Sequence, residues 1–455
     1  MGIAGGEFSV IVSNKEVVAA ILPLQEHWLP LSNLDLLLPP VDVSAFFFYK
    51  RPSKQSNMSF ASIVSVLKKS ISQALVAYYA FGGEIIGNSI GEPELLCNNR
   101  GVDFVEAYAD VDLREVEMYN PDASVEGKLV PKKKEGVLCV QVTELKCGGV
   151  VVACTFDHRI ADAYSANMFL VSWAEVARSK SLSVLPSFRR SPLNPRRPGS
   201  YDKSLDDMYV PISSLPPPPA NPEPAGDHLS SRIYYVTAEN LSWIQDEATR
   251  SGDSKRSKLQ AFTAYLWKMI ANSTDDDKKC TMGIVVDGRT RLNDESMANY
   301  FGNVLSIPYG EASVKELRNN TLDSVADLVS KYLVEATNKE HFLGLIDWVE
   351  AHRPEPAVAK VYAKSSADGP SVVVSSGQRF PANKVDFGWG KPVFGSYHFP
   401  WGGEAGYVMP MPSPLENGDW VVYMHLFKRH LDLVEEEAGD VFRRLSVDYL
   451  KLDQD

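Results

Sequence analysis

The sequence predicts an α/β protein made of two halves of similar size. A chain of 455 residues exceeds the length at which one hydrophobic core normally keeps growing, so two domains are expected. Apolar, β-branched runs alternate with helical patterns, and this alternation stops at a Pro-rich stretch and then starts again. We therefore expect an N-terminal domain at 1–184, a crossover linker at 185–227 and a C-terminal domain at 228–455.

In the first half, residues 60–79 predict an amphipathic helix that ends at Gly82 and Gly83. Its apolar side chains recur every three to four residues, at Ile63, Leu67, Ile71, Leu75 and Tyr78. Short apolar bursts broken by Gly and Asn follow at 84–106. Residues 136–144 and 150–156 predict a hairpin, and a second helical pattern covers 163–177.

The predicted linker at 185–227 is irregular and contains consecutive prolines at 216–219. Because proline removes a backbone donor and fixes φ, we expect neither helix nor sheet pairing there. The second half begins with a strand-like run at 231–236, followed by helical patterns at 239–247 and 258–270. Each half is therefore expected to combine strands and helices.

The composition is that of an ordinary globular protein, with 44% hydrophobic and 23% charged residues. No apolar run approaches the ~18 residues of a membrane span, and the N-terminus lacks a secretory signal pattern. The five cysteines are scattered without a CxxC pair, which favours free thiols. A net charge of −12 argues against a nucleic-acid partner. We expect a cytoplasmic monomer with no membrane or nucleic-acid partner.

His158 and Asp162 are the most informative residues, because His158 lies between the strand predicted at 150–156 and the following helix. A neutral imidazole, with a reference pKa near 6.5, takes a proton from a bound nucleophile and returns it to a leaving group. On its own this HxxxD pattern is weak, because histidine is often a hydrogen-bonded core residue. A metal site is disfavoured, since no third ligand accompanies the pair at a matching spacing.

A second signature lies far downstream, where residues 385–392 read VDFGWGKP. With HxxxD in the first half and DFGWG near the end, the chain resembles the plant BAHD acyltransferases, which transfer acyl groups from coenzyme A to alcohols or amines. Segments at 31–35, 286–292 and 299–303 fit the same family. The resemblance therefore covers nearly the whole chain.

This resemblance implies two acyltransferase-type domains, each a mixed sheet with helices, with a solvent channel between them. It also implies that His158 acts as the general base in a ternary complex, without an acyl-enzyme. Acyl-CoA is then a co-substrate, and no bound cofactor or metal is expected. In the family the aspartate of HxxxD is credited with shaping the loop, so we favour that structural role for Asp162.

The DFGWG segment invites a catalytic interpretation, but its glycines and aromatic rings serve equally well to build a tight, buried turn. We favour the structural role for Asp386, Gly388 and Trp389. Asp386 is expected to pair with Arg289 or Arg291 and so to fasten the second half near the channel. A minority hypothesis has the Trp389 indole N–H donate to the oxyanion of the transition state.

Matching family positions suggest Ser257, Lys258, Ser375 and Ser376 as coenzyme A contacts, because a hydroxyl and backbone N–H groups at a helix start suit a phosphate. Arg379 lies seven residues before Asp386, where shikimate-using relatives carry an arginine that grips the acceptor carboxylate. Gly377 replaces the tryptophan usual nearby, so Arg379 is weak support for an acidic acceptor.

Within the family, segments at 26–40, 158–169 and 395–403 look most like coniferyl alcohol acyltransferases, which esterify a phenylpropenyl alcohol with a short acyl group. The runner-up is a hydroxycinnamoyltransferase that acts on shikimate or quinate, an aliphatic alcohol or an amine. A ligand-binding relative without activity is the alternative from a different class.

A serine esterase is also considered, because residues 87–91 match GxSxG around Ser89. A nucleophile elbow needs a strand before the serine and a helix after it. Ser89 is instead followed by Gly91, Glu92 and Pro93, which predict a turn between short strands. The esterase interpretation is therefore disfavoured.

Overall fold

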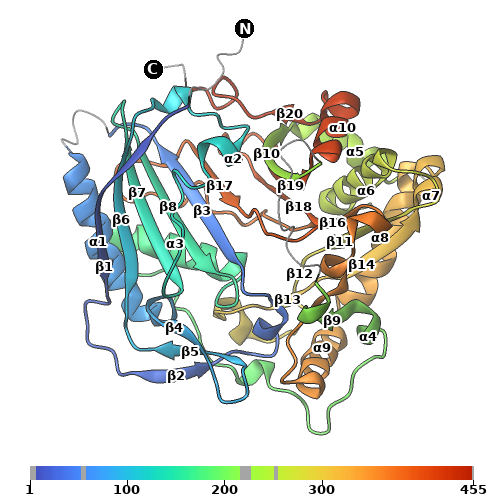
Figure 1. Ribbon diagram of the computed structural model, residues 1–455, viewed down its shortest axis with the longest axis horizontal. Coiled ribbons are helices and arrows are strands. Elements are labelled where there is room, and N and C mark those ends of the chain that lie inside the picture. Colours follow the sequence, from blue (N-terminus) through green and yellow to red (C-terminus); the bar gives the residue numbers. More distant parts are fainter. Residues whose placement is uncertain (1–6, 53–57, 216–226, 251–254, 453–455) are drawn as a thin grey trace.

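The computed structural model describes residues 7–52, 58–215, 227–250 and 255–452. Two large sheets lie side by side, one built mainly from the first half of the chain and one from the second (Figure 1). Both sheets contain parallel and antiparallel pairs. The predicted α/β architecture, with a mixed sheet in each half, is confirmed.

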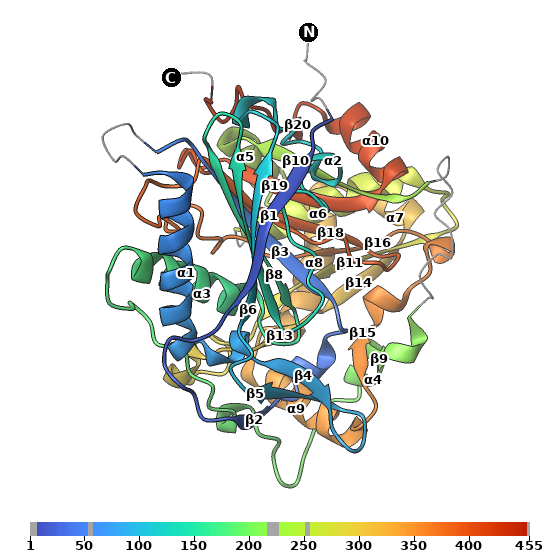
Figure 2. The same ribbon diagram turned by 60° about the vertical axis from the view of Figure 1, so that its left-hand side comes forward.

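The first sheet has six strands, and its parallel pair joins β6 (Val102–Ala109) to β7 (Leu138–Leu145). Two helices, α1 (Phe60–Ala77) and α3 (Ala163–Ala177), pack against each other on one side of it (Figures 1 and 2). In sheet order the strands are β1 (Val10–Val18), β6 (Val102–Ala109), β7 (Leu138–Leu145), β8 (Val150–Asp157), β3 (Asp42–Tyr49) and β17 (Phe394–His398). Both helices predicted for this half are confirmed.

Strands β7 and β8 form the predicted antiparallel hairpin. Every residue of β8 is buried, because helices cover one side of the sheet and the second half of the chain covers the other. A strand buried on both faces is expected to read as a continuous apolar run. This explains why 150–156 has no polar alternation.

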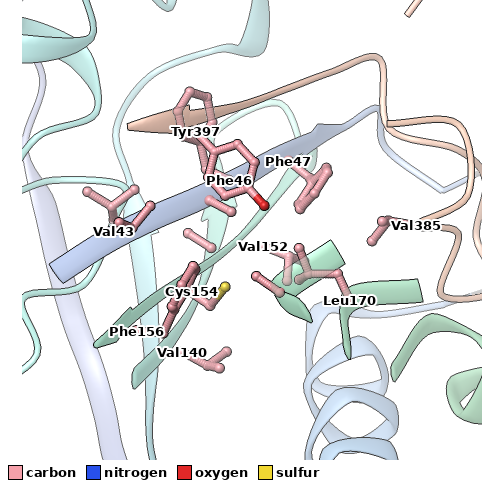
Figure 3. Close-up of a cluster of buried hydrophobic side chains, with 14 of the residues drawn as sticks. Val43, Phe46, Phe47, Val140, Val152, Cys154, Phe156, Leu170, Val385 and Tyr397 are labelled. Carbon is pink, nitrogen blue, oxygen red and sulfur yellow. The ribbon is translucent and has the colours of Figure 1, made fainter. Parts of the chain in front are cut away.

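Strand β17 belongs to the second half of the chain but pairs with β3 in the first sheet. Figure 3 shows the result: Tyr397 of β17 lies beside Phe46 of β3, above Val152 and Cys154 of β8. The core of the first sheet therefore includes residues from beyond the linker. The sequence did not predict the pairing of β17 with β3, because strand pairing between distant segments leaves no local pattern.

The second sheet has seven strands: β14 (Tyr309–Ser313), β11 (Lys279–Ile284), β16 (Ser371–Val374), β18 (Gly406–Pro412), β19 (Trp420–Phe427), β10 (Leu229–Val236) and β20 (Arg443–Arg444). Its core also contains buried residues of α5 (Ala238–Glu247), α6 (Lys258–Ile270), α7 (Val314–Asn319), α8 (Leu322–Ala336) and α10 (Lys428–Ala438). The strand predicted at 231–236 and the helices predicted at 239–247 and 258–270 are confirmed.

The linker expectation is partly wrong. Residues 205–208 form a short helix, α4 (Leu205–Met208), and β9 (Tyr209–Pro211) pairs with β15 (Ala357–Ala359). Tyr209 is buried there, so a few apolar residues were enough to dock this part of the crossover. The prolines at 216–219 lie outside the described residues, and the predicted domain limits stay a prediction.

The remaining elements are mostly short. Ser89 lies in the turn between β4 (Glu84–Gly87) and β5 (Pro93–Cys97), as predicted, and no helix follows it. These elements are β2 (His27–Pro30), β4 (Glu84–Gly87), β5 (Pro93–Cys97), α2 (Pro121–Ser124), β12 (Val286–Asp287), β13 (Leu305–Ser306) and α9 (Lys339–His352). Within the described residues, α1 has the length and apolarity of a membrane span, but a buried core helix has the same properties.

Candidate active site

A cavity of about 600 Å³ lies between the two halves of the chain. Most of the residues predicted to carry function line it: His158, Asp162, Arg289, Arg291, Ser257, Ser375, Ser376 and Arg379. Lys258, Asp386, Gly388 and Trp389 do not. The fold therefore brings predicted residues from four distant parts of the sequence to one space.

His158 is positioned by the end of β8. Its backbone N–H donates to Val41 O at 2.9 Å, which continues the pairing of β8 with the chain that leads into β3. The Asn303 amide donates to the carbonyl of His158 at 2.9 Å and to that of Arg159 at 3.2 Å. The loop that carries the imidazole is therefore fixed from both halves of the chain.

Burial lowers the pKa of His158 below its usual value, because desolvation disfavours the charged imidazolium. The carboxylates of Asp162 and Asp157 and the side chain of Asn303 act in the opposite direction. The ring of Phe399 packs edge-on to the imidazole, with 6.2 Å between ring centroids. At neutral pH the imidazole is therefore uncharged, as a general base must be.

Asn303 and His158 also each carry a buried side-chain atom that forms no hydrogen bond with the described residues. The Nδ1 atom of His158 and the Oδ1 atom of Asn303 are both buried, and neither has a hydrogen-bond partner among the described residues. Asn303 is itself held by Asp35, whose Oδ1 accepts from the Asn303 backbone at 2.7 Å and from its amide at 2.9 Å. The sequence indicates the segment 299–303 as a family match but predicts no role for Asn303.

Asp162 does not contact the imidazole by any hydrogen bond. Its Oδ1 caps α3 by accepting from Ser165 N at 2.9 Å, and its Oδ2 accepts from Val304 N at 3.2 Å. Both oxygens also accept from Arg289, at 2.7 and 3.1 Å. Asp162 thus shapes the loop and the helix start, in line with the role favoured from the sequence.

The expected partner of Asp386 is wrong. Asp386 lies 3.6 Å from Arg178 of the first half, whereas Arg289 pairs with Asp162 and Asp287. Arg291 is exposed. The sequence could not separate these options, because any of several carboxylates can meet an arginine once the chain folds. Arg289 is 3% exposed, so its pairing with Asp162 is fully desolvated.

The DFGWG segment forms a turn that Asp386 closes by accepting from the backbone N–H of Gly388 at 2.8 Å and of Gly390 at 3.1 Å. Both glycines have positive φ, 115° and 120°. The Trp389 ring stacks on Phe387 and lies away from the cavity lining. Because Trp389 does not line the cavity, the structure does not support the oxyanion hypothesis, and its buried indole N–H has no hydrogen-bond partner among the described residues.

Three of the four residues expected to contact coenzyme A line the cavity, and the fourth does not. Ser257 caps α6, where its hydroxyl accepts from Gln260 N at 3.2 Å, and it lines the cavity together with Ser375 and Ser376. Lys258 is the first residue of α6 but is not part of the lining. A helix start therefore faces the cavity on one side, which suits a phosphate or another anion.

Arg379 lies at the cavity with a side chain that is 58% exposed. One guanidinium nitrogen is 3.5 Å from Asp287 Oδ2, and the guanidinium lies over the ring of Tyr164 at 5.0 Å. Asp287 also accepts from Arg289 at 3.2 Å. The charge of Arg379 is therefore partly balanced within the protein before any acceptor binds.

The sequence profile of the Transferase family matches residues 8–441. A hydroxycinnamoyltransferase of Narcissus pseudonarcissus is 28% identical over 428 residues, which cover 90% of this chain and 94% of the relative. A shikimate O-hydroxycinnamoyltransferase of Nicotiana tabacum is 26% identical over 441 residues, 93% of this chain and 97% of the relative.

Two solved structures share the fold. Vinorine synthase superposes with a TM-score of 0.71 at 21% identity, covering 95% of this chain and 98% of that one. TRI101 of F. graminearum, complexed with coenzyme A and deoxynivalenol, superposes with a TM-score of 0.74 at 16% identity, covering 91% and 99%. These fold similarities extend over both halves of the chain.

Proposed function

Because the chain belongs to the Transferase family, that of the BAHD acyltransferases, and is an acyl-CoA-dependent acyltransferase, we propose that it acylates the hydroxyl of a phenylpropanoid-type alcohol with His158 as general base. One observation carries the proposal: His158 directly follows a buried strand, and its uncharged imidazole lines a cavity between the two halves.

In this proposal the reaction is a direct transfer in a ternary complex. His158 removes the proton of the acceptor hydroxyl while the oxygen attacks the thioester carbonyl, because an unactivated alcohol is a poor nucleophile. The tetrahedral centre then collapses, the carbon–sulfur bond breaks, and the imidazolium returns its proton to the thiolate of coenzyme A. A thiol of reference pKa near 8.5 leaves far more readily than an alkoxide.

Two substrates must reach His158 together. Ser257, Ser375 and Ser376 are proposed to contact acyl-CoA, since their hydroxyls and the start of α6 face the same cavity as the imidazole. Pro39, Val41 and Val43 also line the cavity and are proposed to offer an apolar surface to the acceptor. Asp162 and Arg289 hold the loop in place and take no part in proton transfer.

A neutral, coniferyl alcohol-like acceptor is the first choice, because Asp287 already balances part of the Arg379 charge. The acyl donor proposed for this acceptor is an acyl-CoA with a short acyl group. The runner-up, transfer from hydroxycinnamoyl-CoA to shikimate or quinate, draws support from the exposed Arg379 at the cavity and from the names of the relatives. Aliphatic alcohols and amines remain part of that second group. A ligand-binding relative without activity is disfavoured by the intact base.

The test crosses two donors, acetyl-CoA and p-coumaroyl-CoA, with coniferyl alcohol, shikimate and a primary amine, and follows thiol release. We expect thiol release with coniferyl alcohol and its loss in His158→Ala, by a factor of at least about 10². His27→Ala, at an exposed histidine on β2, is the matched control. A folded His158→Ala variant with near-normal turnover refutes the base, and wild-type protein that binds ligands without thiol release supports the inactive relative.

A further inference from the structure

The cavity is lined by four aromatic side chains that take no part in the proposed proton transfer: Tyr362, Phe399, Trp401 and Tyr407. They come from the segment after β15, from the loop between β17 and β18, and from β18 itself. The side chains of Phe399, Trp401 and Tyr407 are buried, with 7–8% exposed surface. We call these four residues the aromatic wall.

The rings of the aromatic wall form two edge-on pairs, and one ring also contacts the proposed base. Phe399 packs edge-on to His158, with centroids 6.2 Å apart, and to Tyr407, with centroids 5.1 Å apart. Trp401 packs edge-on to Tyr362 at 4.9 Å. Burial raises the pKa of the Tyr362 phenol, and the nearby Tyr407 phenol raises it further. The wall therefore begins beside the reacting atoms.

The Trp401 ring is held in one orientation. Its indole N–H donates to Ala405 O at 2.8 Å. A Cβ atom added to Gly403 would overlap the six-membered ring of the indole, so glycine is needed for the ring to lie where it does. An aromatic surface fixed from two sides does not have to be ordered when a ligand binds, which favours recognition of a flat partner.

We propose that the aromatic wall is the subsite for a planar aromatic ring carried by one of the two substrates. Rings prefer edge-to-face or offset contacts with other rings, and such contacts add to the effect of apolar burial. The inference rests on the proposed acyl transfer and names a recognition element of the same cavity. The ring can belong to the alcohol or to the acyl group, and the experiment separates these sources.

The experiment measures kcat/KM for four substrate pairs, in which acetyl-CoA and p-coumaroyl-CoA are each combined with coniferyl alcohol and 1-hexanol. Trp401→Ala and Gly403→Ala should lower kcat/KM on the order of tenfold to a hundredfold for pairs whose aromatic ring meets the wall. The other pairs should change by less than about threefold. Trp401→Phe, which keeps a flat ring, should restore most of the loss. Trp28→Ala, at an exposed tryptophan on β2, is the control.

A loss that follows coniferyl alcohol with both donors assigns the ring to the acceptor, and a loss that follows p-coumaroyl-CoA assigns it to the acyl group. Either result supports the aromatic wall. An equal loss for all four pairs in folded variants, or no loss, overturns it. Calorimetric binding of coniferyl alcohol and p-coumaroyl-CoA to the same variants shows, without turnover, which substrate carries the ring that contacts the aromatic wall. Absence of thiol release from wild-type protein counts against the proposed function alone.

Discussion

Asp162 and Arg289 lie 127 positions apart in the sequence and are joined by two hydrogen bonds of 2.7 and 3.1 Å. Their side chains are 1% and 2% exposed. Arg289 also donates to the carbonyl of Gly302. Two residues further along the chain, the backbone N–H of Val304 donates to Asp162. The carboxylate of the HxxxD motif therefore fastens the loop of His158 to the second half of the chain, at the wall of the cavity.

Removing one partner of this pair should destabilise the protein. Asp162→Ala or Arg289→Ala leaves a buried charge without its counter-ion, at a cost of about 3–5 kcal/mol in the free energy of unfolding. Urea unfolding measures this, and a double-mutant cycle should give a coupling energy of about 1–3 kcal/mol. His158→Ala should change stability much less. A loss below about 1 kcal/mol for Asp162→Ala would contradict this account.

The pH dependence of turnover should report the environment of His158. Burial lowers the pKa of His158 below 6.5, so kcat/KM should rise with pH along a limb below that value and stay level from about pH 7 to 8. The Asn303 side chain raises this pKa, so Asn303→Ala should move the acid limb to lower pH. Asn299→Ala, in the same segment, is the control. An acid limb above pH 7 would show that another group controls turnover.

Substitution of Arg379 should distinguish a negatively charged acceptor from a neutral one. Arg379→Ala should lower kcat/KM with shikimate at least about tenfold, because a carboxylate loses its cation, and change the value with coniferyl alcohol by less than about threefold. The ion pair with Asp287 is exposed on the arginine side, so stability should change little. Equal losses with both acceptors would assign Arg379 to a step common to them.

His430 should make the protein sensitive to acid. It is 1% exposed, neither ring nitrogen has a partner among the described residues, and burial lowers its pKa from 6.5 to about 3. Since the unfolded chain binds the proton more readily, stability falls as the pH drops below 6.5, until the folded pKa is reached. At pH 5 the loss from this residue is about 2 kcal/mol. In His430→Leu the slope of unfolding free energy against pH should be smaller, and an unchanged slope would exclude His430 as a source.

The DFGWG turn should matter for stability rather than for the chemical step. Gly388 has φ 115° and enough space for a methyl group, so Gly388→Ala acts through backbone strain alone, at about 1–2 kcal/mol. Thermal unfolding measures this loss, and kcat at saturating substrate should stay close to wild type. Gly402→Ala has open space and no such strain, and should be neutral. A large loss of kcat in a stable Gly388→Ala variant would assign the turn a catalytic role.

Local pattern by itself determined much of this protein. The period of apolar residues in α1, the all-apolar run of β8 and the restart of helices after the prolines specified elements whose stability depends on nearby residues. The place of His158 between a strand and a helix follows from the same local signals. The order of the two motifs along the chain then carried the resemblance, and the resemblance supplied the expectation of a channel.

Only the tertiary structure decided which distant groups meet. The partner of Asp386 is Arg178 rather than Arg289, β17 pairs with β3 across the linker, and Asn303 reaches the loop of His158. The physical reason is that a charge or a strand edge is satisfied by any complementary group that packing brings close. Sequence spacing limits such pairs only over a few residues, whereas burial and the position of both sheets select among the distant ones.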